Sequence, residues 1–421
     1  MKKKEKITLF LIFFLSFLLH FFYFHHPQEV VFDEVHNGKY IFSYLKGEHF
    51  FDLHPPLAKI SIALLAKIFK ISPNFDFEKI GEKYPSNFYL ILRFLPNFLG
   101  TLFPLVIYLL AKELFHSQKI SLFCAFFCIF ENSLLCQSRF ILTDIFLLFF
   151  GFLGLYFYFL WKRKKRKLYL WLCGASLAFS FSVKWTGLLF LGLCLFLEIK
   201  NLKKNLTSIF GGLLILLFFL YFLIFSLHFF LLKNPGPGDA FFQNFWQKDL
   251  FQRFFETNYK MFWYHQHLEA THPFSSKWYE WFFMRKPIFY WAKDNQKIYF
   301  LGNPFLWLGV LFSIFFTGFE IFKKILKKEG FKKEKVLIFC GYFLNLLPFF
   351  LIKRVVFLYH YLPSLVFGIL ALGYLLKKFS KKSQLIILIL VVFFFFLYAP
   401  LTYGFKISDN YFRLIFFKFW Q

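Results

Sequence analysis

Residues 32–56 begin Phe32-Asp33-Glu34-Val35-His36-Asn37-Gly38-Lys39 and close with Phe50-Phe51-Asp52-Leu53-His54-Pro55-Pro56. This stretch concentrates carboxylates and imidazoles in a chain that is otherwise mostly apolar. It follows an apolar segment of membrane-spanning length, residues 7–24, so we expect it at the water boundary on the far side of a bilayer. Two neighbouring carboxylates raise the proton affinity of one of them, as in a general base or a shared cation site. The plain alternative is a solvated loop with ordinary surface acids.

Composition places the whole chain in a membrane. Its 421 residues are 58% hydrophobic and 26% aromatic, with a mean hydropathy of +0.55, which excludes a water-soluble globule. The formal charge of +27 does not indicate a nucleic-acid partner, because Lys and Arg occur in short blocks between apolar runs and are typical of topology signals. The cysteines lie in or beside apolar runs without metal-ligand spacing, which disfavours disulfides and zinc.

The hydrophobic pattern predicts an all-α polytopic membrane protein with about eleven transmembrane helices. Residues 7–24 are interpreted as an uncleaved first helix, since no small-residue cleavage site follows them. The predicted spans are 7–24, 89–111, 120–135, 140–161, 168–182, 185–198, 208–232, 299–321, 336–352, 355–376 and 384–405.

Charge distribution predicts the orientation. Residues 162–167 are all Lys or Arg, and the positive-inside rule places such a block in the cytoplasm. The N-terminus is then cytoplasmic, and two long segments, 25–88 and 233–297, are external. Most of the Asp and Glu residues fall in these two segments, so we expect polar chemistry on the outer face.

Three predicted helix boundaries carry cationic residues toward the side that holds Asp33. Arg139 lies in a short stretch that ends at Asp144, Lys184 interrupts an apolar course, and Lys353, Arg354 and His360 form a third group. An Arg is suited to bidentate binding of phosphate. Simple alternatives remain open, because Arg139 can pair with Asp144 or reach lipid headgroups, and Lys184 can do the latter.

The same stretches resemble the protein O-mannosyltransferase family, in family order and over nearly the whole chain. Trp281-Phe282 departs from the Trp-Pro that is usual in the family, and the 233–297 segment is too short for the β-trefoil domain of eukaryotic members. The resemblance therefore suggests the compact bacterial form, with 1–421 as one membrane-embedded domain. The matching residues are 32–36, 38–39, 47–48, 50–59, 138–144, 182–188, 236–241, 272–276, 285–287, 302–304 and 359–363.

The resemblance implies a C-type glycosyltransferase fold and a specific reaction. Such an enzyme transfers mannose, with inversion, from polyprenyl-phosphate-mannose to Ser or Thr hydroxyls of unfolded or secreted proteins. It would work at the periplasmic face of a bacterial inner membrane, and dimer formation is left open. Two other functions are weighed: a related transferase that acts on lipid A or another glycolipid, and a transporter. A transporter is disfavoured because the ionisable residues gather at one face and not at mid-membrane.

On this interpretation each candidate residue has an expected role. Asp33 is the catalytic base, and Glu34 orients the acceptor or tunes Asp33. Arg139 holds the donor phosphate, helped by Lys184, Lys353, Arg354 or His360, while His54 and Asp144 support these groups. No cofactor is predicted, because phosphate can leave without a general acid when cations stabilise it. A divalent metal that bridges Asp33, Glu34 and Asp144 is left open.

Overall fold

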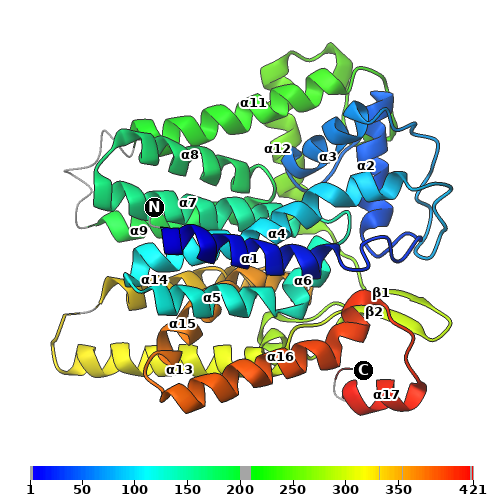
Figure 1. Cartoon of the computed structure of the whole chain (residues 1–421). Helices are drawn as coiled ribbons and strands as arrows, with labels where there is room; N and C mark the ends of the chain where they lie inside the picture. The colour runs from blue at the N-terminus through cyan, green and yellow to red at the C-terminus, as the bar shows by residue number, and fades with distance from the viewer. Residues whose placement is uncertain (1–2, 200–209, 331, 353, 418–419, 421) are drawn as a thin grey trace.

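The computed structural model describes the chain except residues 1–2, 200–209, 331, 353, 418–419 and 421. Long helices form a bundle, and a second layer of short helices and one hairpin covers one end of it (Figure 1). The bundle contains α1 (Lys3–Phe21), α4 (Phe88–Phe115), α5 (Gln118–Ile129), α6 (Asn132–Ser138), α7 (Asp144–Lys164), α8 (Lys167–Phe181), α9 (Leu188–Glu198), α11 (Leu216–Leu231), α13 (Pro304–Leu326), α14 (Lys333–Leu344), α15 (Leu362–Leu376) and α16 (Lys381–Tyr403).

Each predicted span overlaps one of these helical elements, and the all-α polytopic class is confirmed. Among the described residues, six helices are long and apolar enough to cross a membrane, or seven if the bent pair α5 and α6 is one span. Shorter apolar helices, α8 and α9, fill out the bundle. The predicted number of about eleven crossings therefore stays a prediction.

Several predicted boundaries are wrong, for local reasons. The span 120–135 is two helices, bent by 60° at a break. The span 299–321 begins only at Pro304, because residues 299 and 300 belong to a strand and Asn303 caps the helix by accepting from the Leu306 N–H at 3.2 Å. The span 336–352 ends as an α-helix at Leu344, and a 3₁₀ turn, η7 (Leu347–Phe350), follows.

Helix α15 is the centre of the bundle and packs against α5, α13 and α14. Its apolar window is 94% buried. Small residues make this burial possible, since a Cβ on Gly368 would lie 2.2 Å from Val310 and one on Gly373 would lie 2.4 Å from Cys124. The 3₁₀ turn η8 (Leu358–Tyr361) leads into α15 and sets the position of His360.

The covering layer is built from the two segments that were predicted to be external. The first contributes α2 (Glu34–Lys46) and α3 (Leu57–Ile68). The second contributes α12 (Leu250–His267), short 3₁₀ turns and most of an antiparallel hairpin of β1 (Ile288–Lys293) and β2 (Gln296–Phe300). The hairpin was not predicted. A last short helix, α17 (Asp409–Ile415), follows α16.

Two glycines join the two segments closely. The His49 N–H donates to the Asn234 carbonyl, and the Gly238 N–H donates to the His49 carbonyl, both at 2.9 Å. A Cβ on Gly236 would lie 2.4 Å from the His49 oxygen, and one on Gly238 would lie 2.5 Å from the Phe50 backbone. Because any larger residue would push the backbones apart, this glycine pair fixes how the second segment covers the first.

Candidate active site

Glu34 anchors the turn that carries Asp33. Its side chain is 0% exposed, and Arg93 of α4 grips both oxygens through Nε and Nη2 at 2.7 Å. The Val31 N–H at 2.9 Å, the Tyr84 hydroxyl at 3.0 Å and the Ile141 N–H at 3.0 Å complete the set of donors. Both carboxylate oxygens are thus occupied inside the protein. Glu34 holds the turn against α4 and α6–α7, and its oxygens do not face an open space.

Asp33 differs from Glu34 although the two are adjacent. No residue in the described part of the chain donates a hydrogen bond to its carboxylate or pairs with it. Burial raises the pKa of Asp33 to about 7, with Asp144 and Asp52 acting in the same direction and Lys184 acting against them. A carboxylate that is free of partners and titrates near neutrality has the properties of a general base.

Lys184 and Asp144 form a buried ion pair beside Asp33. The Lys184 ammonium donates to Asp144 Oδ1 at 2.7 Å, and the Gln137 amide donates to Asp144 Oδ2 at 2.8 Å. The Lys184 Nζ also lies 4.9 Å from the ring centroid of Tyr359. Lys184 therefore has fixed partners and does not reach out toward lipid headgroups.

A cavity of about 210 Å³ opens next to this pair and brings together four of the residues singled out from the sequence. Lys184, Arg354, His360 and His54 all line it. The Arg354 guanidinium contacts the Val355 carbonyl at 3.3 Å, and no described acidic residue pairs with it. The remaining lining residues are Trp185, Thr186, Phe262, His265, Gln266, Phe349 and Ile352. A cavity lined by two cationic side chains, by imidazoles and by several apolar side chains suits a phosphate that carries a lipid tail.

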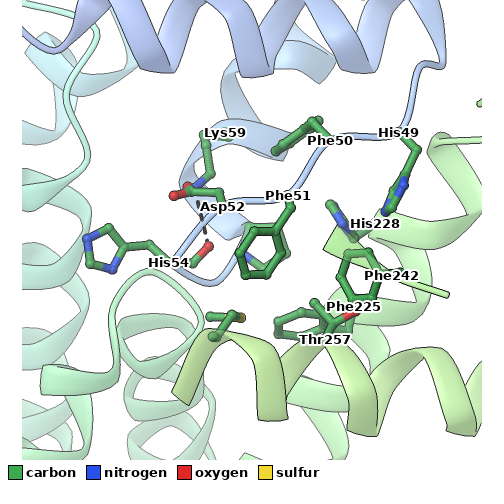
Figure 2. A pocket seen from close by; sticks show the side chains of 12 residues that line it. His49, Phe50, Phe51, Asp52, His54, Lys59, Phe225, His228, Phe242 and Thr257 are labelled. Carbon is green, nitrogen blue, oxygen red and sulfur yellow. Dashed lines mark hydrogen bonds and ion pairs between the residues drawn. The ribbon is translucent and has the colours of Figure 1, made fainter. Parts of the chain in front are cut away.

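His54 is held at the edge of this cavity by its own turn. Lys59 pairs with Asp52 and donates to the His54 carbonyl at 3.3 Å (Figure 2). Burial lowers the pKa of His54 well below its usual value, so its imidazole is neutral. Beyond the same turn, Phe51, Phe225, Phe242 and His228 surround a small separate cavity of about 10 Å³ (Figure 2). The turn thus separates a tightly packed side from the open cavity.

Residues of α12, which were not among the predicted site residues, also reach the cavity. His265 donates from Nε2 to the Leu53 carbonyl at 2.9 Å, and its ring centroid lies 5.6 Å from that of His54. Trp185, next to Lys184, lies 5.5 Å from the His265 ring. The run of polar and aromatic residues at 263–267 was the available signal, since it ends an amphipathic helix at a predicted water boundary.

Arg139 does not join this group. It is 1% exposed and donates to three carbonyls at the end of α1 and just after it, those of His20 at 3.3 Å, Phe22 at 2.8 Å and Tyr23 at 2.8 Å. Its guanidinium stacks on Tyr403 at 4.6 Å. The structure thus favours an anchoring role for Arg139, with carbonyls as its partners in place of Asp144 or headgroups. Lys353, which was also predicted to bind the donor phosphate, lies outside the described residues.

We expect Arg139→Lys to lower stability and to leave donor use unchanged. Lysine has one terminal nitrogen and cannot replace the two guanidinium nitrogens that bind the Phe22 and Tyr23 carbonyls, and buried carbonyls left unpaired cost about 1–3 kcal/mol. Thermal unfolding in detergent should show the loss, while the donor KM stays within about twofold of the parent value. A donor KM that rises tenfold at unchanged stability would instead show that Arg139 binds the donor phosphate.

No group of three or more His, Cys, Asp or Glu side chains in the described part of the chain is arranged to hold a metal ion. A divalent metal that bridges Asp33, Glu34 and Asp144 stays a hypothesis, which the transfer assay with a chelator tests.

Comparison with known proteins identifies relatives along the whole chain. The family model described as dolichyl-phosphate-mannose-protein mannosyltransferase matches residues 10–233. A second model, the C-terminal four-transmembrane region of protein O-mannosyltransferase, matches residues 250–420. Dolichyl-phosphate-mannose–protein mannosyltransferase 4 of Schizosaccharomyces pombe is 34% identical over 276 residues, which are 59% of this chain and 35% of that protein. Protein O-mannosyl-transferase 2 of Danio rerio is 32% identical over 261 residues, 57% of this chain and 34% of that protein. The chain spans about a third of the length of these curated relatives.

Solved structures share the fold. The Saccharomyces cerevisiae protein O-mannosyltransferase Pmt1–Pmt2 complex bound to the sugar donor matches with a TM-score of 0.92 at 19% identity, over 98% of this chain and 92% of that one. ArnT from Cupriavidus metallidurans matches with a TM-score of 0.58 at 15% identity, over 92% and 63%. These likenesses confirm the predicted C-type glycosyltransferase fold.

Proposed function

This chain belongs to the dolichyl-phosphate-mannose–protein mannosyltransferase family, and from that membership we propose that it transfers mannose from polyprenyl-phosphate-mannose to Ser or Thr hydroxyls of exported proteins. The observation that carries the proposal is the contrast at residues 33 and 34. One carboxylate is locked by Arg93. Its neighbour Asp33 is free of partners, has a pKa raised to about 7 by burial, and lies within the electrostatic influence of Lys184, which lines the cavity.

Asp33 acts as the base in a single inverting displacement. The acceptor hydroxyl oxygen forms its bond to the anomeric carbon of mannose while the bond from that carbon to the phosphate oxygen breaks. The hydroxyl proton passes to Asp33, and the polyprenyl phosphate leaves with the electron pair of the broken bond. Asp33 later returns the proton to water. A pKa of about 7 suits this task, because a base works best when its pKa lies near the working pH.

The leaving phosphate is stabilised by the cationic residues that line the cavity. Lys184 and Arg354 supply positive charge, and His360 supplies a hydrogen-bonding ring from η8, the turn before α15. Lys184 stays aimed at the cavity because Asp144 holds it. Arg354 is the best-suited direct phosphate ligand, since its guanidinium has no acidic partner among the described residues and its planar fork matches phosphate.

We infer the position of the lipid tail and the membrane face of the site from the cavity and from helix α12. Phe262 lines the cavity and is 53% exposed, and three further aromatic side chains of α12, Phe251, Phe255 and Tyr259, are more exposed still. An exposed aromatic row on an amphipathic helix is typical of the membrane interface. We place the site at the periplasmic face of a bacterial inner membrane, with residues 162–167 in the cytoplasm. Dimer formation and the identity of the acceptors stay predictions.

The deciding experiment uses the purified full-length chain, polyprenyl-phosphate-mannose and a Ser/Thr-rich peptide. We expect mannosylated peptide by mass spectrometry, with equal yield in the presence of a chelator. Loss of transfer in chelator that is restored by a divalent cation would overturn the metal-free mechanism. A parallel reaction with lipid A as acceptor tests the alternative, and transfer to the lipid alone would replace the protein acceptor by a glycolipid.

A further inference from the structure

The β1–β2 hairpin contains an irregularity at one residue. Phe289 pairs with Tyr299 and Trp291 pairs with Ile298, so Tyr290 is an extra residue on β1. A bulge of this kind gives up ladder pairing and turns a side chain in a new direction, and bulges are common next to active sites. Tyr290 is 0% exposed. The side chain that the bulge redirects therefore points into the protein.

The carbonyl and the ring of Tyr290 contact the turn that carries Asp33. Phe32, directly before Asp33, has a φ of +39°, which is rare for a residue with a large side chain. The Phe32 N–H donates to the Tyr290 carbonyl at 3.1 Å. The two rings stack at 4.6 Å with an interplanar angle of 7°. Such a backbone conformation persists only where its surroundings enforce it, and Tyr290 supplies two of the enforcing contacts.

The hydroxyl of Tyr290 is linked through other buried side chains to Lys184. It donates a hydrogen bond to Gln137 Oε1. Gln137 in turn donates from its amide to Asp144 Oδ2 at 2.8 Å, and Asp144 Oδ1 holds Lys184 at 2.7 Å. The chain of contacts Tyr290–Gln137–Asp144–Lys184 is buried throughout. The orientation of the lysine ammonium is thus tied to the hairpin.

We propose that Tyr290 is a positioning residue that fixes the separation of Asp33 and Lys184, and this inference rests on the proposed function. In a single displacement the base must receive the proton while the cation receives charge on the leaving phosphate. Both groups must therefore sit at set distances from one reacting carbon, and small displacements are costly. One rigid residue with a contact to each side provides that spacing.

The two contacts can be separated by substitution. Tyr290→Phe removes the hydroxyl and keeps the ring stack, so it should act through Gln137 and Asp144 on Lys184. We expect kcat to fall about 3- to 10-fold and the donor KM to stay within about twofold, because the charge that Lys184 stabilises develops only as the phosphate leaves. Tyr290→Leu also removes the stack, so it should add a fall in kcat of about 10- to 100-fold. The matched control is Tyr299→Phe on β2, where no described residue hydrogen-bonds the hydroxyl, and both constants should stay at parent values.

A second readout does not depend on activity. The amide of Phe32 should exchange hydrogen about tenfold faster in Tyr290→Leu, because loss of the stack loosens the turn, and at the parent rate in Tyr290→Phe. Peptides that cover residues 30–36 report this by mass spectrometry. If Tyr290→Leu does not fold, the split between KM and kcat in Tyr290→Phe decides alone.

The outcomes distinguish this inference from the proposed function. If the parent protein transfers no mannose, the proposed function fails, and the exchange data still test whether Tyr290 holds the turn. If the parent is active but Tyr290→Phe raises the donor KM without lowering kcat, or matches Tyr299→Phe in both, the positioning role is overturned. Unchanged exchange at Phe32 in a folded Tyr290→Leu protein would overturn it as well.

Discussion

Asp33→Asn is expected to slow mannose transfer by about 10²- to 10⁴-fold, the usual effect of losing a general base. Asparagine keeps the shape of the side chain but cannot take a proton from a hydroxyl near neutral pH. Donor binding should persist, because Lys184, Arg354 and the apolar cavity wall remain in place. It should even tighten slightly, since a negative charge near the phosphate is removed. Single-turnover transfer and direct binding of polyprenyl-phosphate-mannose measure the two effects separately.

The matched control is Asp294→Asn in the turn of the hairpin. Asp294 is exposed, has no side-chain hydrogen-bond partner among the described residues, and has a φ of +51°, which asparagine tolerates. This variant loses one negative charge, as Asp33→Asn does, on the same face of the molecule. Its transfer rate should match that of the parent protein. Equal activity of Asp33→Asn and Asp294→Asn would remove the turn at residues 32–34 from the mechanism.

Glu34→Ala should cause the largest loss of stability. It leaves the Arg93 guanidinium, which is fully buried, without its carboxylate, and breaking one side of a buried ion pair costs about 3–5 kcal/mol. The double variant Glu34→Leu with Arg93→Leu should recover much of that loss, because no uncompensated charge remains. The measurement is the free energy of unfolding in detergent for the single and double variants.

The result also separates the two roles considered for Glu34. If Glu34 holds the turn, the turn should be less ordered in the double variant than in the parent protein. The folded fraction of that variant should then transfer mannose more slowly. A single variant that is as stable as the parent but inactive would show instead that Glu34 acts on the acceptor directly. This second outcome would contradict the locked geometry described above.

The membrane class, the helical elements and the gathering of Lys184, Arg354, His360 and His54 were predictable from the sequence. Apolar runs of spanning length constrain these helices strongly, and charge asymmetry predicts on which side their ends lie. Ionisable residues at those ends then fall on one face of the bundle. A one-dimensional pattern was therefore enough to predict that these residues gather, but not the cavity that they line.

The contacts of Glu34 and Arg139 were not accessible in this way. The partner of Glu34 is Arg93, which lies 59 positions away inside the predicted span 89–111 and does not stand out there. Arg139 has carbonyls as partners, more than 110 positions earlier in the chain. Backbone partners leave no signature in sequence. An arginine that grips a phosphate and one that holds a helix end therefore look the same until the three-dimensional contacts are known.

The hairpin was missed for a related reason. Residues 288–300 are rich in aromatic and apolar side chains, and a short apolar run next to a membrane span is ambiguous between strand and helix. Its importance lies in one bulged residue, Tyr290, whose effect depends on contacts with residues 32 and 137. Local pattern cannot reveal such a long-range link.

The most direct test of the central claim is the pH dependence of single-turnover transfer at saturating donor. Asp33 is active as a base only when it is deprotonated, and its pKa is raised to about 7. The account predicts a rate that rises about tenfold per pH unit below pH 7 and levels off above it, and an Asp33→Asn rate that is low and without this limb. A parent rate that is flat from pH 5 to 9, or the same limb retained in Asp33→Asn, would contradict Asp33 as the catalytic base.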